Sequence, residues 1–438
     1  MVARPRSPSR ANPDSVTQYS AMAESGTSSL SQRVAFTHPG FALFLFARWF
    51  VVACLEMQSV AVAWQVYSIT HRVLDLGLIG LAQFLPGICL FLVSGHAVDR
   101  FRRRSILFSC YLGFTVCASL LFWITVHGVG SIRWIYAVIV LLGVVRSFNF
   151  PATRAIIPEM VPEEHLPNAI AWASTTFTSA TILGPSIGGV IYALFKGPVA
   201  VYATAMALSA LATFSLLGVN PVSKPRAREP ISLKTVMAGL HYIRSKKLIL
   251  GSISLDLFAV LLAGAVALLP AYASDILKTG PHGLGLLRSA QGIGAAAMAI
   301  FLAYRPLRKK AGTTLFACVA LYGMFTIVFG LSRNFYLSFA ALILVGACDM
   351  VSVIIRAVLI QVATPDEMRG RVNAVDMVFI GASNQLGEAE SGFTAAWLGV
   401  VPAVVLGGVG AILVAALWAW GFPELRRTDS LTSEENLA

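Results

Sequence analysis

The sequence predicts an all-α polytopic membrane protein, with twelve transmembrane helices arranged as two pseudo-symmetric six-helix bundles. Its 438 residues are 57% hydrophobic and only 12% charged, and the mean hydropathy is +0.74. Such a composition is typical of membrane proteins and not of soluble domains. Apolar runs of about 20 residues, the length that crosses a hydrocarbon core as helix, recur along the chain. Short motifs of the first half also reappear in the same order in the second half.

The order of polar and apolar segments sets the domain organisation. Residues 1–38 are rich in Ser, Pro and Arg and lack an apolar core, which predicts a disordered cytoplasmic tail and not a signal peptide. The predicted spans lie near 40–64, 75–98, 105–126, 134–157, 167–194, 198–218, 248–273, 283–303, 313–332, 335–361, 371–396 and 399–421. We therefore expect an N-terminal bundle over 39–219, a linker over 220–247, a C-terminal bundle over 248–422 and a cytoplasmic tail over 423–438.

The distribution of basic residues predicts the orientation in the membrane. Connections that follow even-numbered spans hold most of the arginines and lysines, whereas those on the other side hold about one each. Positive charge in short connections marks the cytoplasmic side, so we expect both termini in the cytoplasm. The net charge of +12 follows from this topology and does not indicate a nucleic-acid partner.

The linker between the halves contains a predicted amphipathic helix. In the segment 232–244, apolar residues recur at helical spacing and the opposite face is basic. We expect this helix to lie at the cytoplasmic surface, where it tethers the two halves.

A short connection between the second and third spans carries one acid and four arginines. Its pattern Gly-x-x-x-Asp-Arg-x-x-Arg-Arg is formed by Gly95, Asp99, Arg100, Arg103 and Arg104. The pattern resembles the loop 2–3 signature of the major facilitator superfamily of secondary transporters. The resemblance implies that Asp99 pairs with basic groups and a helix amino terminus across the bundle interface, and so latches a cytoplasmic gate. The alternative is a cluster of charges that only sets the orientation in the membrane, in which Asp99 merely reduces the net positive charge.

The fifth span contains a group of small residues, Gly184, Pro185, Gly188 and Gly189. Gly184 and Gly188 are one turn apart and share a face, so a neighbouring helix can approach closely, while Pro185 is expected to bend the span. The segment resembles the antiporter motif of exporting members of the superfamily. The alternative is a packing seam of small residues without a role in coupling.

The resemblance extends over nearly the whole chain after residue 40. The segments 151–162, 255–273, 283–292 and 369–374 look like the branch that contains the enterobactin exporter and macrolide efflux proteins. This implies the major facilitator fold, with a substrate cavity between the bundles, but leaves the substrate open. For the internal repeat, we align 80–87 with 285–292 and 183–189 with 386–392.

Charged residues at lipid depth are candidate functional groups, because each is costly unless it faces a cavity or a partner. The resembled fold places Glu56, Arg146, Asp256 and Asp349 on cavity-lining spans. We interpret Glu56, Asp256 and Asp349 as candidate proton carriers, and Arg146 with Asp349 as a candidate ion pair across the cavity. The alternative for each is a structural charge satisfied by nearby groups. The candidate cavity and substrate residues are Arg48, Gln58, Arg146, Phe148 and Asn149.

Two glutamates of the eleventh span receive a different interpretation. Glu388 and Glu390 are two residues apart on a predicted helix, so at most one of them can face the cavity. We expect interface packing to be their main role.

Sequence patterns argue against an enzyme. There is no phosphate-binding Gly-x-x-x-x-Gly-Lys-Ser/Thr loop and no His-Glu-x-x-His zinc motif, and the six cysteines lie within apolar runs. We expect no cofactor and no metal, and a monomer whose partners are a small-molecule substrate, protons and the lipid bilayer. The favoured function is proton-coupled export of drug-, macrolide- or siderophore-like amphipathic molecules by alternating access. Uptake on the same fold, or a non-transporting sensor or scaffold, are the alternatives.

Overall fold

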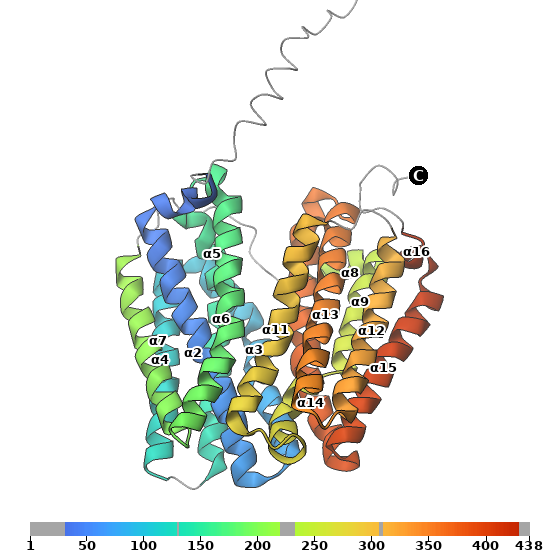
Figure 1. The fold of residues 1–438 in the computed structure, drawn as a ribbon. Helices are drawn as coiled ribbons and strands as arrows, with labels where there is room; N and C mark the ends of the chain where they lie inside the picture. Colours follow the sequence, from blue (N-terminus) through green and yellow to red (C-terminus); the bar gives the residue numbers. More distant parts are fainter. Residues whose placement is uncertain (1–30, 129–130, 220–232, 306–309, 429–438) are drawn as a thin grey trace, which may run out of the picture.

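The computed structural model describes residues 31–128, 131–219, 233–305 and 310–428 (Figure 1). The predicted tail up to residue 30 and the polar part of the linker, 220–232, lie outside the described residues.

Long helices occupy each of the twelve apolar windows. The first half contains α2 (Pro39–Thr70), α3 (Val73–Arg100), α4 (Arg103–Val126), α5 (Ile132–Met160), α6 (Leu166–Leu194) and α7 (Val199–Ser215). The second half contains α9 (Lys247–Leu262), α11 (Gly280–Tyr304), α12 (Ala311–Leu331), α13 (Phe335–Ala363), α14 (Asp366–Leu398) and α15 (Val400–Gly421). Among the described residues, eleven helical segments are long and apolar enough to cross a membrane. The remaining long helix, α14, runs alongside them but is more polar because it carries several charges (Figure 1).

The two halves repeat the same helix pairing. In the first half α2 packs on α6 and α7, α3 on α5, and α4 on α5 and α7. The second half pairs α9 with α14 and α15, α11 with α13, and α12 with α13 and α15. Between the halves, α6 packs on α11 and α3 on α14, which are equivalent pairs under exchange of the halves. This is the pseudo-symmetric arrangement of two six-helix groups that the sequence predicts.

The contacts between the halves gather at one side of the molecule. We call the side where α2 begins and α15 ends the terminal side, and the opposite side the distal side. Figure 1 shows α6 and α11 close together at the distal side, below, and diverging toward the terminal side, above. Close backbone approaches link Gly189 to Gly285 and Gly77 to Gly392, all in the distal parts of their helices. Val60 of α2 also joins an apolar cluster with distal residues of the second half.

These close approaches correct the predicted register of the repeat. A Cβ on Gly143 would meet the backbone of Gln83, and one on Gly346 would meet the backbone of Gln291. Gln83 of α3 is therefore equivalent to Gln291 of α11. The alignment of 80–87 with 285–292 is therefore wrong by three residues. It pairs glycines within these two segments, whereas the equivalent helix crossings are made by Gly143 and Gly346.

The seventh span is interrupted, whereas the sequence predicts one continuous helix. After α9 the chain forms η4 (Ala265–Leu268), α10 (Leu269–Ala271) and a π-helical turn, η5 (Tyr272–Ile276). At the break, Gly264 lies so close to the backbone of Gly387 on α14 that a side chain would not fit. Pro270 follows, and it cannot donate a helix hydrogen bond. The interruption brings the segment that contains Val266 and Pro270 to the boundary between the halves.

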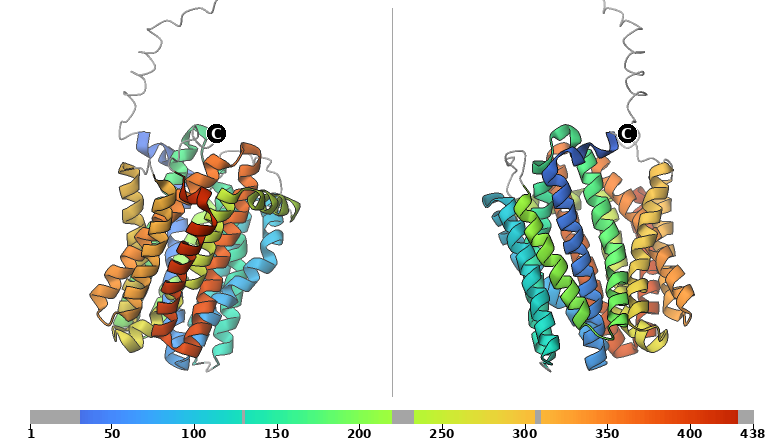
Figure 2. Two further views of the ribbon diagram at one scale, coloured as in Figure 1. Left: turned by 90° about the vertical axis from the view of Figure 1, so that its right-hand side faces the viewer. Right: turned by 60° about the vertical axis from the view of Figure 1, so that its left-hand side comes forward.

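The amphipathic linker helix is present as α8 (Leu233–Ser245), which agrees with the predicted segment apart from Ser232, outside the described residues. Its residue Ile243 is buried in a cluster with Ile249 of α9 and Val372 of α14, and the Tyr242 hydroxyl donates to the Ala363 carbonyl oxygen at 3.3 Å. Figure 2 shows α8 lying across the terminal ends of the neighbouring helices. The apolar face of α8 therefore packs on the second half.

Each predicted tail contains a short helix among its described residues. Residues Ser31–Thr37 form a short helix, η1, on the terminal end of α6: the Ala35 amide donates to Asn168 Oδ1 at 3.3 Å, and Phe36 packs edge-on against Trp172. At the other end, α16 (Pro423–Arg426) buries Leu425 against the second half. A few contacts of single side chains hold these segments against the two halves.

Candidate functional site

A polar cavity of about 170 Å³ lies between the two halves. The first half contributes α2, α3 and α5, and the second half contributes the interrupted seventh span, α11 and α14. The polar lining residues are Glu56, Ser59, Gln83, Arg146, Arg288, Gln385 and Glu388. We call this space the central cavity.

Two acids and two arginines give the central cavity a balanced set of charges. Glu56 and Arg146 belong to the first half, and Arg288 and Glu388 to the second, and the four interact electrostatically. Among the described residues, none of these four forms an ion pair within 4.0 Å. Arg146 instead donates to Gln83 Oε1 at 2.9 Å, and its Nε has no hydrogen-bond partner. Charges held near one another without a fixed pairing can change partners when the halves move.

The two glutamates of α14 point in different directions, as their spacing predicts. Glu388 faces the central cavity, and a Cβ placed on Gly80 would lie 2.8 Å from its Oε2. Glu390 accepts a hydrogen bond from Thr394 Oγ1 of the same helix at 2.6 Å. Glu388 therefore belongs to the candidate site and is not confined to interface packing.

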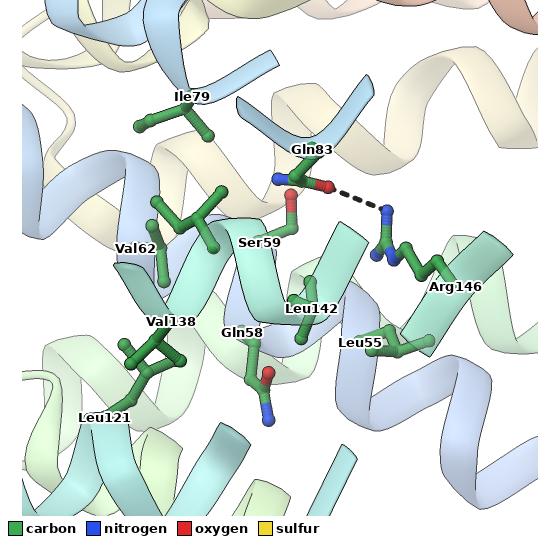
Figure 3. A pocket seen from close by; sticks show the side chains of 11 residues that line it. Leu55, Gln58, Ser59, Val62, Ile79, Gln83, Leu121, Val138, Leu142 and Arg146 are labelled. Carbon is green, nitrogen blue, oxygen red and sulfur yellow. Dashed lines mark hydrogen bonds between the residues drawn. The ribbon is translucent and has the colours of Figure 1, made fainter. Parts of the chain in front are cut away.

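A second, more apolar cavity lies inside the first half (Figure 3). Gln83, Ser59 and Arg146 border both cavities, and the hydrogen bond from Arg146 to Gln83 is drawn in Figure 3. Gln58 lines this inner cavity, where its amide nitrogen donates to Cys54 Sγ at 3.4 Å and its Oε1 has no partner. The predicted role of Gln58 as a substrate contact thus concerns the inner cavity and not the central one.

The other predicted cavity residues are dispersed. Phe148 packs against the apolar core of the first half, and Asn149 Oδ1 accepts a hydrogen bond from Thr153 at 3.5 Å. Neither borders the two cavities described here. Arg48 lies nearer the terminal side, with its guanidinium 5.7 Å from the ring centre of Phe177.

Asp256 and Asp349 belong to a separate charge cluster inside the second half. Arg356 of α13 forms an ion pair with Asp256 of α9, and its Nε lies 3.6 Å from Asp376 Oδ1 on α14. Asp349 interacts electrostatically with both members of the ion pair. Two carboxyl groups therefore lie within 4.0 Å of one guanidinium, and a third, that of Asp349, is close enough to interact with it electrostatically. Sequence reasoning missed Arg356 and Asp376, although Arg356 shares its span with Asp349 and was identifiable as a charge at lipid depth.

The expected ion pair between Arg146 and Asp349 is not formed. The two residues do occupy equivalent positions, since each lies three residues after the glycine that packs on an equivalent glutamine. Arg146 is engaged by Gln83 in the central cavity, whereas Asp349 is held in the cluster around Arg356. Equivalent positions in two halves give equivalent depths but do not guarantee contact.

The arginines of the loop motif interact within the first half. Arg103 is buried and pairs with Glu159 of α5, and Arg104 Nε donates to the Leu216 carbonyl oxygen at 3.1 Å. Such contacts hold the terminal ends of α4, α5 and α7 together. Gly95 is buried and Arg100 is exposed, and the side chain of Asp99 lies outside the described part of the structure.

The small residues of α6 serve two different neighbours. Gly184 and Gly188 both pack on α2, and a Cβ on Gly184 would lie 2.7 Å from Glu56 Cβ. Gly189 faces the second half, where a Cβ would lie 3.0 Å from Gly285 Cα. The predicted shared face of Gly184 and Gly188 is thereby confirmed. The helix α6 therefore contacts Glu56 through Gly184 and the second half through Gly189.

Two symmetric groups of membrane helices around a charged cavity define a secondary transporter of the major facilitator fold. A bacterial homologue of the human lysosomal transporter Spinster, in an inward-facing and occupied conformation, matches with a TM-score of 0.69 and 12% identity, covering 89% of this chain and 99% of that one. A D-xylose–proton symporter matches with a TM-score of 0.67 and 13% identity, covering 88% and 98%.

The family follows from the sequence comparison. A family model described as transmembrane secretion effector matches residues 31–437, and the chain belongs to this family of the major facilitator superfamily. The enterobactin exporter EntS of Shigella boydii serotype 4 is 28% identical over 402 residues, which cover 89% of this chain and 94% of the exporter. The EntS of Citrobacter koseri is 29% identical over 403 residues, with the same coverage. The protein is thus a multi-pass membrane transporter and not an enzyme, as the sequence predicts.

Proposed function

We propose that the protein exports amphipathic, siderophore-like small molecules across the bacterial inner membrane in exchange for protons, and that the terminal side is cytoplasmic. The single observation that carries this proposal is the central cavity, where both halves contribute one acid and one arginine without a fixed ion pair. Similarity to enterobactin exporters favours the export direction. The arginines of the loop motif, which lie at the terminal side, favour its cytoplasmic location.

Alternating access supplies the mechanism. The halves meet at the distal side through backbone contacts at Gly189–Gly285 and Gly77–Gly392, and they diverge at the terminal side (Figure 1). This arrangement corresponds to a state in which substrate enters from the cytoplasm. Rocking of one half against the other would open the distal contacts and close the terminal side. In this second state we expect Asp99 to latch the terminal ends of the helices.

Protons have three candidate carriers at two places in this mechanism. Glu56 borders the central cavity and lies against Gly184, so a change in its charge acts directly at the helix that contacts the second half. Asp256 and Asp349 lie in a buried cluster with more acids than bases, where a proton relieves the excess negative charge. We propose that a single chain is the transporting unit, since it contains both halves of the cavity.

Transport into inverted inner-membrane vesicles tests the proposal, with enterobactin as the probe. The vesicles come from a strain that lacks its own exporter of this compound. We expect accumulation that requires an acidic vesicle interior and stops when a protonophore is added. The double variant Glu56→Gln, Asp256→Asn should lose this dependence on the pH gradient. Accumulation only in right-side-out vesicles would favour uptake and overturn export, and unchanged gradient dependence in the double variant would reject these two carriers.

A further inference from the structure

Two arginines of the first half lie near each other toward the terminal side, each over an aromatic ring. The guanidinium carbon of Arg48 on α2 is 5.7 Å from the ring centre of Phe177 on α6. That of Arg154 on α5 is 4.7 Å from the ring centre of Phe150. We call these four residues the arginine–phenylalanine group. Three different helices bring them together.

Neither arginine has a carboxylate partner among the described residues. Two other arginines of the same depth are paired with acids: Arg103 with Glu159, and Arg356 with Asp256. Arg48 and Arg154 instead lie close enough to repel each other, and the buried Nη1 of Arg48 has no hydrogen-bond partner. Arg48 is half-buried and Arg154 is exposed, so an anion that is not part of the described chain can reach both guanidiniums and relieve both their repulsion and the cost of the unpaired Nη1.

The group lies at the boundary between the halves. Arg154 contacts the sulfur of Met377, which belongs to α14 in the second half. The rings of Phe150 and Phe177 are 56% and 47% exposed, so they are open to a ligand. Arg48 and Phe177 lie in the terminal parts of α2 and α6. A molecule that enters between the halves from the terminal side therefore meets this group before the central cavity.

The second half has the opposite balance of charge in its interior. At comparable helix positions the second half carries the acids Asp256, Asp349 and Asp376, arranged around Arg356. In the register set by Gly143 and Gly346, Arg154 is equivalent to Ala357, the neighbour of Arg356, and Arg154 lacks such acids. The two halves thus differ: the first has arginines without acid partners at this depth, and the second encloses more carboxyl groups than arginines.

We propose that the arginine–phenylalanine group binds an anionic group attached to an aromatic ring, and that this is the part of the substrate first held by the transporter. A guanidinium binds a carboxylate or a similar oxyanion through two parallel N–H donors, and the exposed rings supply stacking surfaces for an aromatic ring. That the bound molecule is then transported rests on the proposed function, but binding itself does not.

Equilibrium binding to the purified full chain in detergent tests the proposal without a proton gradient. The probes are three molecules with one ring system: 1-naphthoate, the neutral 1-naphthalenemethanol and the cationic 1-naphthylmethylammonium. We expect 1-naphthoate to bind at least about tenfold more tightly than the neutral probe, and the cation to bind least. Hexanoate, an anion without a ring, should compete poorly with labelled 1-naphthoate. Phosphatidylglycerol should displace labelled 1-naphthoate only at a concentration equal to or higher than that of unlabelled 1-naphthoate. Displacement by the lipid at lower concentration would identify an anionic headgroup as the ligand and overturn the aromatic requirement.

Variants assign the binding to these residues. Arg48→Gln and Arg154→Gln should each weaken 1-naphthoate binding about tenfold and leave the neutral probe unchanged. Phe177→Leu should weaken both probes, and Arg48→Lys should restore part of the affinity because it keeps the charge. Arg133→Gln, at an exposed arginine on the distal side, is the matched control. Thermal unfolding of each variant shows whether it is folded.

Two results would overturn the inference. One is equal affinity for the charged and neutral probes, and the other is wild-type affinity for 1-naphthoate in both folded arginine variants. Either result, together with intact enterobactin transport, would leave the proposed function standing. Conversely, tight 1-naphthoate binding without gradient-driven transport would retain the site and reject the proton-coupled function.

Discussion

Arg356 of α13 forms an ion pair with Asp256 of α9 inside the second half, where only 3% of the arginine is exposed. The same guanidinium lies near Asp376, which joins the terminal part of α14 to the pair. Three helices are therefore held around one positive charge. Because α14 also contacts α3 of the first half, a change of charge in this cluster can affect the contact between the halves.

Removing one member of this pair should be costly for stability. Arg356→Gln leaves buried carboxyl groups without a counter-charge, and we expect it to lower the free energy of unfolding by about 3–5 kcal/mol. The double variant Arg356→Gln, Asp256→Asn removes both charges and should recover part of this loss. Thermal unfolding in detergent measures both effects. Equal destabilisation by the single and double variants would show that the charge pair is not the cause.

The glutamates of α14 provide an internally controlled transport experiment. Glu388→Gln removes a charge that faces Arg146 and Arg288 in the central cavity, whereas Glu390 is engaged by Thr394 on its own helix. We expect Glu388→Gln to reduce enterobactin transport in vesicles about tenfold, a change of ~1.4 kcal/mol, and Glu390→Gln to have little effect. The two side chains are chemically identical and only two residues apart. A larger loss for Glu390→Gln would contradict the assignment of Glu388 to the site.

A hydrogen bond between Tyr67 and Asp275 connects α2 to the π-helical turn of the second half at the distal side. Hydrogen bonds to charged groups contribute about 1.5–3 kcal/mol, so Tyr67→Phe should favour opening of the distal side. To measure this opening, the native cysteines are replaced and Ser59→Cys is introduced. An impermeant maleimide added from the distal side should label this cysteine faster in the Tyr67→Phe variant.

The matched control for this experiment is Tyr136→Phe. Tyr136 makes a similar hydrogen bond, to Asp75 Oδ1 at 3.1 Å, but both residues belong to the first half. This variant should leave the labelling rate unchanged. Similar acceleration by both tyrosine variants would mean that general loosening, and not release of the contact between the halves, is responsible.

Most of the fold could be predicted from the sequence, because the length and position of apolar windows are set by the bilayer. The predicted windows agree with the long helices to within a few residues, and α8 also lies where its periodicity predicts. The break at Gly264 could not be predicted, since it depends on the close approach of Gly387 from a helix more than a hundred residues later. The short helices η1 and α16 escaped notice because their burial depends on single side chains such as Ala35 and Leu425.

The sequence predicts which charged residues belong to the candidate site better than it predicts which of them lie next to one another. Glu56 and Arg146 were expected at a cavity and do border one, since spans at equivalent places in the fold line it. Their neighbours Arg288 and Glu388 required knowledge of how α11 and α14 are rotated about their axes. Asp376 lies within the predicted eleventh span, but near its polar beginning, and nothing in the sequence indicates that it meets Arg356 of the preceding span. Composition and spacing specify depth in the membrane, whereas helix rotation decides which charges meet.

The contact of Gly189 with Gly285 offers the sharpest test of alternating access. A Cβ on Gly189 would lie 2.6 Å from the Pro281 carbonyl oxygen and 3.0 Å from Gly285 Cα, and both are backbone atoms that cannot rotate away. Gly189→Val should therefore destabilise this conformation by about 1–3 kcal/mol through overpacking. A state with the distal side open is not destabilised, because α6 and α11 are then apart at this point. We expect faster maleimide labelling of the Ser59→Cys reporter from the distal side and slower enterobactin transport. Gly381→Val is the control, because a Cβ there meets nothing within 4 Å. Unchanged labelling and transport in Gly189→Val would mean that α6 and α11 need not approach this closely, and that the distal contact is not one of the two closed gates of the cycle.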